Sequence, residues 1–228
     1  MRLDRFLSEA TGLTRSMAKK ALHRGDVTVD GEVIKKSDQQ IHGQAVRLEG
    51  RLLNEPQPRY VLLHKPAGYI SATQDEVHPC VFALLPPELC RGMQCAGRLD
   101  VDTTGLLLLT DDGQWSHRLR SPKHQCQKVY QVDLAEPLAP GVAQLFSEGI
   151  MLHGEDSPTL GAQLDVLSET RVLLTIQEGK YHQVKRMFAA VGNFVVALHR
   201  LKVGEIVLED SLAEGQWRFL TPEEVASI

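Results

Sequence analysis

Two carboxylates stand close together in the segment AGRLDVDTTGLLLLTDDG, residues 96–113. Asp100 and Asp102 are separated by one valine, and Thr103 and Thr104 follow at once. Side chains of this kind can serve as nucleophiles or as general acids and bases. The Gly and Leu run that follows must be buried, so it predicts an apolar strand directly after the acids.

The same spacing formally satisfies Asp-x-Asp-x-Thr, which is typical of haloacid dehalogenase-type phosphotransferases. In such enzymes the motif ends an apolar strand, so that the carboxylates emerge at the strand's C-terminal edge. Here the apolar run comes after the motif, and a Gly-rich phosphate loop of the Walker type is absent. An aspartic protease is also disfavoured, because Thr104 stands where Asp-Thr-Gly needs glycine.

We expect different roles for the two acids. Asp102, followed by Thr103 and Thr104, is suited to fix a tight loop by local hydrogen bonds, each worth roughly 1 kcal/mol. Asp100 would then stand in a rigid loop, which is what a catalytic carboxylate needs. The hypothesis is therefore that Asp102 shapes the loop and Asp100 performs the chemistry.

No metal site is indicated by the sequence. The four cysteines form no Cys-x-x-Cys pair, and the nine histidines show no ligand spacing such as His-Glu-x-x-His. The cysteines are expected to be ordinary reduced thiols.

From residue 60 onward, short apolar runs alternate with turns and predict strands. Helices are predicted at QWSHRLRS, GVAQLFSEG and YHQVKRMFAAVG, and a capping box at Thr221 to Glu224 opens a short terminal helix. A regular βαβ repeat is missing. The pattern favours an α+β fold with a largely antiparallel sheet.

The first fifty residues predict a small separate unit. Residues 2–11 read as an amphipathic helix ended by Gly12, and Thr14 is expected to cap a second helix that ends at Gly25. Asp30-Gly31 predicts a hairpin. The apolar stripe of the second helix is expected to contain Met17, Ala18, Ala21 and Leu22.

Charge is unevenly distributed along the chain. The net charge is −4, but residues 1–50 hold nine Lys or Arg against seven Asp or Glu, whereas the rest holds 16 against 22. The motifs RLDRFL and RGDVTVDGEVI resemble an S4-type RNA-binding domain, which grips the phosphate backbone of RNA. The residues expected to form the RNA-binding face are Arg2, Arg5, Arg15, Lys19, Lys20 and Arg24.

Four motifs in order resemble the RsuA family of ribosomal RNA pseudouridine synthases. They are HKPAGY, GRLDVDTTGLLLLTDDG, KVY and EGKYHQVKRMFAAVG. The stretch TDDGQWSHRLRSPKH is most similar to the member that acts on 16S ribosomal RNA. The resemblance implies an S4-type domain over residues 1–48, a linker over 49–59, and a synthase domain over 60–228 with a largely antiparallel mixed sheet and a central cleft.

The resemblance also implies a reaction. Such enzymes break the bond between ribose C1′ and uracil N1, turn the base, and join C1′ to C5, with no cofactor or metal. The essential acid maps to Asp100, its cationic partner to Lys185, and the aromatic residue that stacks on the uracil to Tyr130. Whether the acid attacks C1′ or works through a glycal-like intermediate stays open.

Further residues are assigned to substrate binding. Leu198 is expected to close the pocket beneath the base, and Arg98 and Arg186 to hold the flipped nucleotide or a phosphate. His64 stands where the family usually has Asn, which leaves the role of that position open. The cations expected along the RNA path are Lys65, Arg118, Arg120, Lys123, Lys128, Lys180, Arg200 and Lys202.

The expected partner is 16S ribosomal RNA or an assembly intermediate of the small subunit. The chain shows no apolar run long enough to span a bilayer, so we expect a cytoplasmic protein, and a monomer. The alternative is a non-catalytic RNA-binding assembly factor that uses the N-terminal domain alone. An intact set of Asp100, Tyr130 and Lys185 argues against that alternative.

Overall fold

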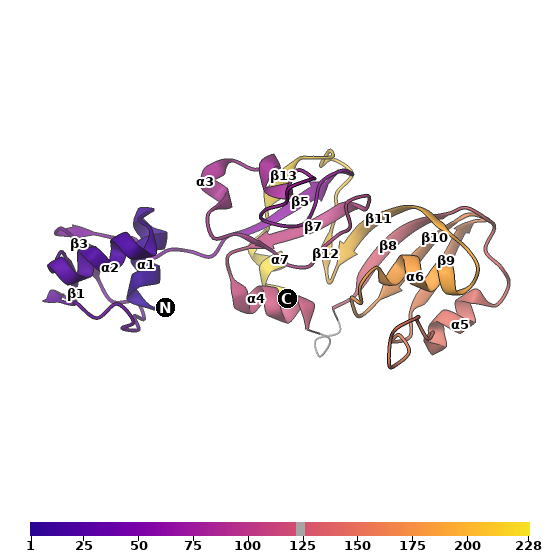
Figure 1. The fold of residues 1–228 in the computed structure, drawn as a ribbon, viewed down its shortest axis with the longest axis horizontal. Coiled ribbons are helices and arrows are strands. Elements are labelled where there is room, and N and C mark those ends of the chain that lie inside the picture. Colours follow the sequence, from indigo (N-terminus) through magenta and orange to yellow (C-terminus); the bar gives the residue numbers. More distant parts are fainter. Residues whose placement is uncertain (122–125) are drawn as a thin grey trace. The chain divides into compact units, whose positions relative to one another are not determined.

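The computed structural model describes residues 1–121 and 126–228. Within them the chain forms two compact units, Met1–Pro58 and Arg59–Ile228 (Figure 1). The division falls directly after Pro58, in a segment where two prolines and a lack of pattern predict a linker. Each unit has its own hydrophobic core and is described by itself.

The first unit packs two helices against a small antiparallel sheet. The helices are α1 (Leu3–Thr11) and α2 (Arg15–Arg24). The strands are β1 (Val27–Val29), β2 (Glu32–Val33), β3 (Val46–Leu48) and β4 (Arg51–Leu52), in the order β2-β1-β3-β4. Leu3, Leu7 and Leu22 of the helices are fully buried with Val27 and Val46 of the strands.

Local capping chemistry sets the ends of these helices as predicted. The Thr14 hydroxyl accepts a hydrogen bond from the Met17 amide at 3.2 Å, and Gly25 ends α2 in the left-handed region at φ 85°. The placement of Met17 in the apolar stripe is wrong, because its side chain is 50% exposed. Each helical step turns the side chain by about 100°, and Met17 falls beside the buried face that begins at Ala18.

The predicted linker begins too early. Arg51–Leu52 pairs with β3 as β4, and Glu49 and Gly50 make the connecting turn with φ values of 50° and 80°. Leu53 packs against the core of the first unit. Such a short hairpin lacks the alternation that marks longer strands, so the sequence pattern did not indicate it.

The second unit is built on a nine-stranded mixed sheet. Its strands are β5 (Tyr60–Lys65), β6 (Gln94–Cys95), β7 (Thr104–Thr110), β8 (Lys128–Leu134), β9 (Gln163–Ser168), β10 (Arg171–Ile176), β11 (Val195–Val203), β12 (Ile206–Val207) and β13 (Trp217–Phe219). The order is β13-β5-β7-β11-β8-β10-β9, with β6 on β7 and β12 on β11. Among the strands that the structure describes, only β7 and β11 pair in parallel, which confirms the largely antiparallel mixed sheet.

Helices cover both faces of this sheet (Figure 1). They are the 3-10 helix η1 (Val81–Leu84), α3 (Pro87–Cys90), α4 (Gly113–Arg120), α5 (Val142–Glu148), α6 (Gln183–Ala190) and α7 (Pro222–Ala226). Leu107 and Leu109 of β7 face the core that includes residues of α5 and α6, whereas Leu106 and Leu108 face the core that includes residues of α4. The leucine run is therefore apolar throughout because both faces of β7 are covered.

The predicted caps in this unit are also present. Asp112 accepts hydrogen bonds from the amides of Gln114 and Trp115 at the start of α4, and Thr221 and Glu224 form the predicted capping box of α7. These caps follow from residues within three positions of one another, which is why they could be predicted from the sequence.

Gly105 permits the parallel contact at the middle of the sheet. Its φ is +105°, and a Cβ at this position would lie 2.3 Å from the Arg200 carbonyl oxygen. The residue pairs with Arg200 in the register that joins β7 to β11. Only glycine allows this approach, and it places the loop that ends at Thr103 beside β11.

Candidate active site

The Asp100 carboxylate contacts two basic side chains from the start of α6. Asp100 Oδ2 lies 3.2 Å from Lys185 Nζ, and Asp100 Oδ1 lies 3.3 Å from His182 Nε2. The Asp100 side chain is 28% exposed, so it is open to a ligand. The predicted partnership between Asp100 and Lys185 is thus geometrically satisfied, since segments 85 positions apart in sequence meet here.

Asp102 makes a contact distant in sequence besides the local backbone hydrogen bond expected of it. Its carboxylate binds Lys185, with Nζ to Oδ1 and Oδ2 distances of 2.7 and 2.9 Å. Burial tends to raise the pKa of Asp102, but the hydrogen bonds and charge of Lys185 outweigh it and hold that pKa below its usual value. Burial likewise tends to lower the pKa of Lys185, and its bonds to Asp102 and Asp100 raise it overall. The pair therefore keeps an ammonium beside Asp100.

The two threonines depart from the predicted local bonds. The Thr103 hydroxyl is buried without a hydrogen-bond partner among the described residues. The Thr104 hydroxyl lies 2.7 Å from Nδ1 of His199 on β11, a contact between positions 95 apart in sequence. Local hydrogen bonding is available to threonine in a turn, but here the neighbouring strand provides the partner instead.

A buried lysine supports the backbone of the loop that carries Asp100 and Asp102. Lys65 is fully buried at the end of β5, and its ammonium donates to the carbonyl oxygens of Pro66, Val101 and Thr103 at 3.0, 3.3 and 2.8 Å. Burial lowers its pKa to about 8. The carbonyls of residues 101 and 103 flank Asp102, so one side chain fixes the backbone on both sides of it.

Further contacts hold the residues just before and after Asp100. The Ser71 hydroxyl donates to the Leu99 carbonyl at 2.9 Å and accepts from the Leu99 amide at 3.1 Å. The Gly68 amide donates to the Val101 carbonyl at 2.8 Å. Leu99 itself is 6% exposed in the core. The loop that carries Asp100 is therefore held by residues distant in sequence, in addition to a local turn in which the Thr103 amide donates to the Asp100 carbonyl oxygen at 3.1 Å.

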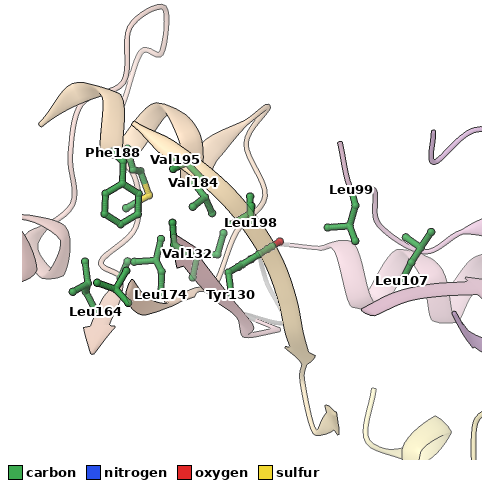
Figure 2. Close-up of a cluster of buried hydrophobic side chains, with 14 of the residues drawn as sticks. Leu99, Leu107, Tyr130, Val132, Leu164, Leu174, Val184, Phe188, Val195 and Leu198 are labelled. Atoms are coloured by element: carbon green, nitrogen blue, oxygen red, sulfur yellow. The ribbon is translucent and has the colours of Figure 1, made fainter. Parts of the chain in front are cut away.

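Tyr130 lies in the apolar layer next to this loop. It is 7% exposed and shares the core with Leu198, and its hydroxyl points toward Leu99 in the close-up (Figure 2). Arg200 Nη1 donates to the Tyr130 hydroxyl at 3.3 Å and lies 3.5 Å from the Arg98 carbonyl oxygen. Arg200 therefore links Tyr130 to the segment that carries Asp100.

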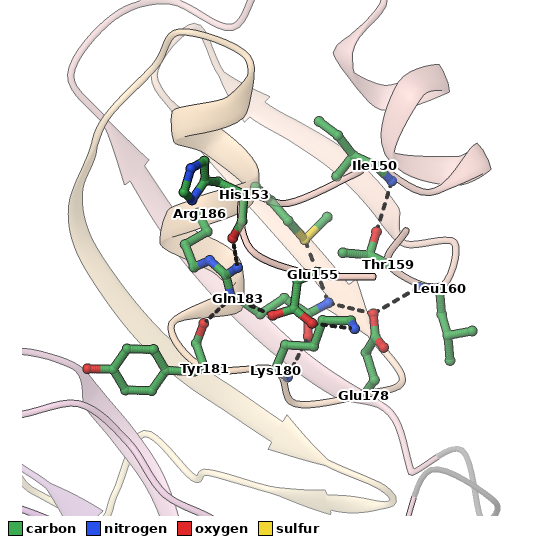
Figure 3. Close-up of polar contacts among 11 residues, drawn as sticks. Ile150, His153, Glu155, Thr159, Leu160, Glu178, Lys180, Tyr181, Gln183 and Arg186 are labelled. Atoms are coloured by element: carbon green, nitrogen blue, oxygen red, sulfur yellow. Dashed lines mark hydrogen bonds and ion pairs between the residues drawn. The ribbon is translucent and has the colours of Figure 1, made fainter. Parts of the chain in front are cut away.

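Arg186 does not join the Asp100 cluster. Its guanidinium pairs with Glu155 at 2.9 Å and donates to the carbonyls of Tyr181 and His153 at 2.9 and 2.6 Å (Figure 3). Lys185 and Arg186 are adjacent on α6, so they point in different directions. Of the two basic residues, Lys185 contacts the candidate catalytic acid and Arg186 braces the loop over residues 153–155.

Three of the cations expected along the RNA path are buried instead. Lys65, Lys128 and Arg200 are 0%, 9% and 3% exposed. Each donates to backbone carbonyl oxygens: Lys128 to Cys126 at 3.0 Å and Arg200 to Leu106 at 2.8 Å, for example. Their assignment to the RNA path is wrong because buried backbone acceptors, rather than solvent, surround them.

The other expected path residues are at least partly exposed. Lys180 pairs with Glu155 at 2.9 Å and Lys202 with Glu205 at 3.5 Å, while Arg118 and Arg120 donate to carbonyl oxygens of Ile228 and Ser116. Lys123 lies outside the described residues. Arg98 is exposed, and its guanidinium makes no hydrogen bond or ion pair with a described residue.

The six basic residues of the first unit fall into two groups. Arg2, Arg5 and Arg24 pair with Asp4, Glu9 and Asp26 at 2.8, 2.6 and 2.6 Å. The second group is exposed on α2 and has no ion pair within the described part of the chain; it comprises Arg15, Lys19 and Lys20. The unpaired charge of the predicted face is thus concentrated on one helix.

Sequence reasoning missed His182. It lies in the motif EGKYHQVKRMFAAVG, in which only Lys180, Lys185 and Arg186 were assigned roles. The backbone of His182 is in the left-handed region at φ 48° and ψ 36°, which turns its ring toward Asp100. A histidine next to the helix start was visible in the sequence, but its unusual backbone conformation was not.

The ring of His64 contacts other residues of the protein. Its Nδ1 lies 2.7 Å from the Leu212 carbonyl oxygen, and its ring packs edge to face with His199 at 5.4 Å. Nε2 of His64 is buried without a partner among the described residues. His199, which also contacts Thr104, has its pKa lowered mainly by burial.

The arrangement can perform nucleophilic or proton-transfer chemistry. An ionisable carboxylate stands between an ammonium and an imidazole, next to an apolar layer with an aromatic ring. Within residues 1–121 and 126–228, no cluster of three or more His, Cys, Asp or Glu side chains could hold a metal ion. No helix of the same residues is long and apolar enough to cross a membrane.

Comparisons with known proteins agree with this geometry. Residues 59–190 match the family model described as RNA pseudouridylate synthase, and residues 1–50 match the S4 domain. The match to residues 59–190 covers the loop of Asp100 and all of α6. The acid therefore lies before its strand in a synthase domain, which disfavours the phosphotransferase interpretation.

Full-length relatives extend the match. Proteins named ribosomal small subunit pseudouridine synthase A are 51% identical in Yersinia pestis and 52% in Vibrio cholerae, over 100% of this chain and 98% and 99% of theirs. The relative from Escherichia coli strain K12 is 47% identical over the full length of both chains. A crystal structure of a pseudouridylate synthase matches with a TM-score of 0.73 and 48% identity, covering 100% of this chain and 99% of that one. The chain therefore belongs to the RNA pseudouridylate synthase family, with an S4 domain preceding its synthase domain.

Proposed function

We propose that this enzyme converts a specific uridine of 16S ribosomal RNA to pseudouridine, with Asp100 as the catalytic residue. The observation that carries the proposal is the Asp100 carboxylate held 3.2 Å from the Lys185 ammonium on a loop fixed by buried contacts. The names of the full-length relatives support the small ribosomal subunit as the source of the substrate. They favour this function over that of a non-catalytic assembly factor.

The reaction needs no net oxidation or reduction. The bond between C1′ and N1 breaks, the base turns, C1′ bonds to C5, and the proton lost from C5 is balanced by one gained at N1. Asp100 can attack C1′ as a nucleophile, or it can stabilise and deprotonate a glycal-like intermediate. Both routes use the ionised carboxylate, for which Lys185 provides the counter-charge.

Neighbouring residues would bind the flipped nucleotide. A uridine inside paired RNA cannot reach Asp100, so it must leave its stack at a cost of a few kcal/mol. Tyr130 would stack on the uracil and Leu198 would close the pocket beneath it, since both belong to the apolar layer beside Leu99. The guanidinium of Arg98, which is exposed and has no ion pair with a described residue, would hold a phosphate, whereas the existing bonds of Arg186 favour a bracing role.

The first unit would deliver the synthase domain to RNA. Arg15, Lys19 and Lys20 are exposed on α2 and make no ion pair with a residue that the structure describes, which favours contact with phosphates. We further propose that the enzyme acts as a cytoplasmic monomer on free 16S RNA or on an assembly intermediate of the small subunit.

The catalytic assignment is tested by incubating the protein with a 16S ribosomal RNA transcript and mapping pseudouridine. Asp100→Asn removes the negative charge at nearly constant size, so the rate of product formation should fall by at least about 100-fold. Asp165→Asn, on the exposed strand β9, is the matched control and should keep wild-type activity. Equal product from Asp100→Asn and wild type would refute the assignment, and no product from either would favour the assembly factor.

A further inference from the structure

Two aromatic rings form a stack at the start of α6. The rings of Tyr181 and His182 lie 3.7 Å apart between centroids, with an angle of 22° between their planes. Tyr181 is 77% exposed, so one ring face contacts His182 and the other is open to solvent. Neither residue packs in the hydrophobic core. The stack therefore needs an explanation other than folding stability.

The stack is directly connected to the candidate catalytic acid. The imidazole of His182 contacts Tyr181 with its face and approaches Asp100 Oδ1 with Nε2, at 3.3 Å. His182 holds this position from a left-handed backbone conformation, which is uncommon for residues other than glycine. Such conformations persist where the surrounding structure enforces them, often at functional sites.

The backbone beneath the stack is braced on several sides. Arg186 Nη1 donates to the Tyr181 carbonyl at 2.9 Å, and the Gln183 side-chain oxygen accepts from the Lys180 amide at 2.9 Å. Lys180 and Arg186 both pair with Glu155 at 2.9 Å. In Figure 3 the Tyr181 ring points away from all these contacts. A rigid backbone thus presents a flat, uncovered aromatic ring.

We propose that the open face of Tyr181 stacks on an unpaired RNA base, that of a nucleotide next to the target uridine. The inference rests on the proposed function, because the target must reach Asp100 and its neighbours must pass beside it. Bases released from a helix are commonly stacked on aromatic side chains. A three-layer stack of base, Tyr181 and His182 would hold the strand in register with Asp100.

The surroundings favour a nucleic acid over a protein partner. Charged residues lie close to Tyr181 in the sequence, with Lys180 before it and Lys185 after it, whereas the core of a protein interface is depleted of charge. Arg98 is exposed without a partner among the described residues, and it is two positions from Asp100. Its charge is available for the phosphate of the stacked nucleotide.

The test compares Tyr181→Ala, Tyr181→Phe and Tyr181→Leu in single-turnover reactions on the 16S transcript, with melting curves to check folding. Tyr181→Ala should raise the RNA concentration for half-maximal rate by about 10-fold, and the maximal rate should change little. Tyr181→Phe should behave as wild type, because stacking uses the ring and not the hydroxyl. Tyr181→Leu should resemble Tyr181→Ala. The matched control is Phe194→Ala, which removes a ring that is 71% exposed at the start of β11.

A second measurement reports the stack itself. Once the modified uridine is mapped, 2-aminopurine is placed at each flanking nucleotide, and its fluorescence is followed on binding to the inactive Asp100→Asn protein. We expect the fluorescence of 2-aminopurine at one flanking position to be quenched on binding. The quenching should be lost in the double variant that carries both Asp100→Asn and Tyr181→Ala. The proposal would be overturned if Tyr181→Ala left both the RNA concentration for half-maximal rate and the quenching unchanged. It would also be overturned if Tyr181→Phe bound RNA as weakly as Tyr181→Ala. Absence of product from the wild type would instead refute the proposed function.

Discussion

Lys65 shows how one buried side chain can support the loop that carries Asp100 through backbone contacts. A buried ammonium is costly unless its hydrogen bonds are satisfied, and here three carbonyl oxygens satisfy them. Two of these acceptors, the carbonyl oxygens of Val101 and Thr103, belong to the loop that carries Asp100. Lys65 is therefore a positioning residue, and its effect on Asp100 is transmitted through the backbone of residues 101 and 103.

We expect Lys65→Met to destabilise the protein by about 2–3 kcal/mol at pH 7, because buried carbonyls lose their donor. The difference in free energy of unfolding between the wild type and Lys65→Met should grow as the pH rises. The pKa of Lys65 is about 8 in the folded protein against an ordinary 10.5, so between these values the unfolded chain binds more protons than the folded one. Stability that depends on Lys65 thus increases from pH 8 to 10.5 and is constant below that window.

Urea unfolding of wild type and Lys65→Met at pH 7 and pH 9.5 measures this effect. Other groups that titrate in the same range are common to both proteins, so their contributions cancel in the difference. Parallel pH dependence of the two free energies of unfolding would contradict the prediction.

At this scale, the sequence predicted Asp100 as the catalytic acid but not the residues that support its loop. The motif around Asp100 and the basic position of Lys185 are local patterns, so both could be assigned. Lys65 was expected to face RNA, because residue type alone places a lysine at the surface. His182 went unassigned since only its backbone conformation brings it to Asp100.

At the scale of elements, the contact between β7 and β11 determines where the active-site loop lies. Gly105 allows the two strands to approach, and Arg200 opposite it joins the carbonyl of Leu106 to the hydroxyl of Tyr130. A side chain at Gly105 would meet the backbone of Arg200 at 2.3 Å, which no rotamer can relieve.

Gly105→Ala should therefore destabilise the protein by about 3 kcal/mol or more and reduce activity strongly. Thermal melting and pseudouridine formation measure the two effects. Gly141→Ala is the control for backbone strain alone, because its φ is +85° with nothing within 4 Å of the new Cβ. It should cost only about 1–2 kcal/mol. Equal losses from the two variants would show that the close approach to Arg200 is unimportant.

Element boundaries could be predicted where the signal is local. Thr14, Asp112 and the Thr221 capping box mark helix starts, and each acts over two or three residues. The strand pattern also indicated a mostly antiparallel sheet. The parallel pairing of β7 with β11 could not be predicted, because it joins positions about 95 residues apart and no local feature encodes such a contact.

At the scale of the molecule, the two units divide binding from chemistry. Of the six basic residues predicted to bind RNA, the three without an ion pair in the described part of the chain lie on α2 of the first unit, whereas Asp100 lies in the second unit. The net charge of −4 hides this division, because the excess of acids belongs to the synthase domain.

Replacing Arg15, Lys19 and Lys20 together by Ala should weaken RNA binding and reduce the slope of log K against log salt by about 2–3. The maximal rate at saturating RNA should remain near that of wild type. Lys35, Lys36 and Arg47, which are exposed in the same unit but outside the helices, provide a control of equal charge change. An unchanged slope for the α2 variant, or an equal reduction for the control, would refute the assignment of this face.

The organisation into two units was foreseeable from composition and from the prolines before residue 59. The exact end of the first unit could not be predicted, because the turn at Glu49 and Gly50 folds Arg51–Leu52 back onto β3. Which of the basic residues are free also required the structure. Three of the six have acids placed two or four positions away in the sequence.

The contacts that hold the Asp100 loop have an implication for synthesis on the ribosome. They come from Lys65 and Ser71, before the loop, and from Lys185 and Arg200, about 85 to 100 positions after it. The first unit, in contrast, has all its core residues by position 53. A growing chain can thus complete the core of its first unit while the Asp100 loop still lacks the supports that come from later residues.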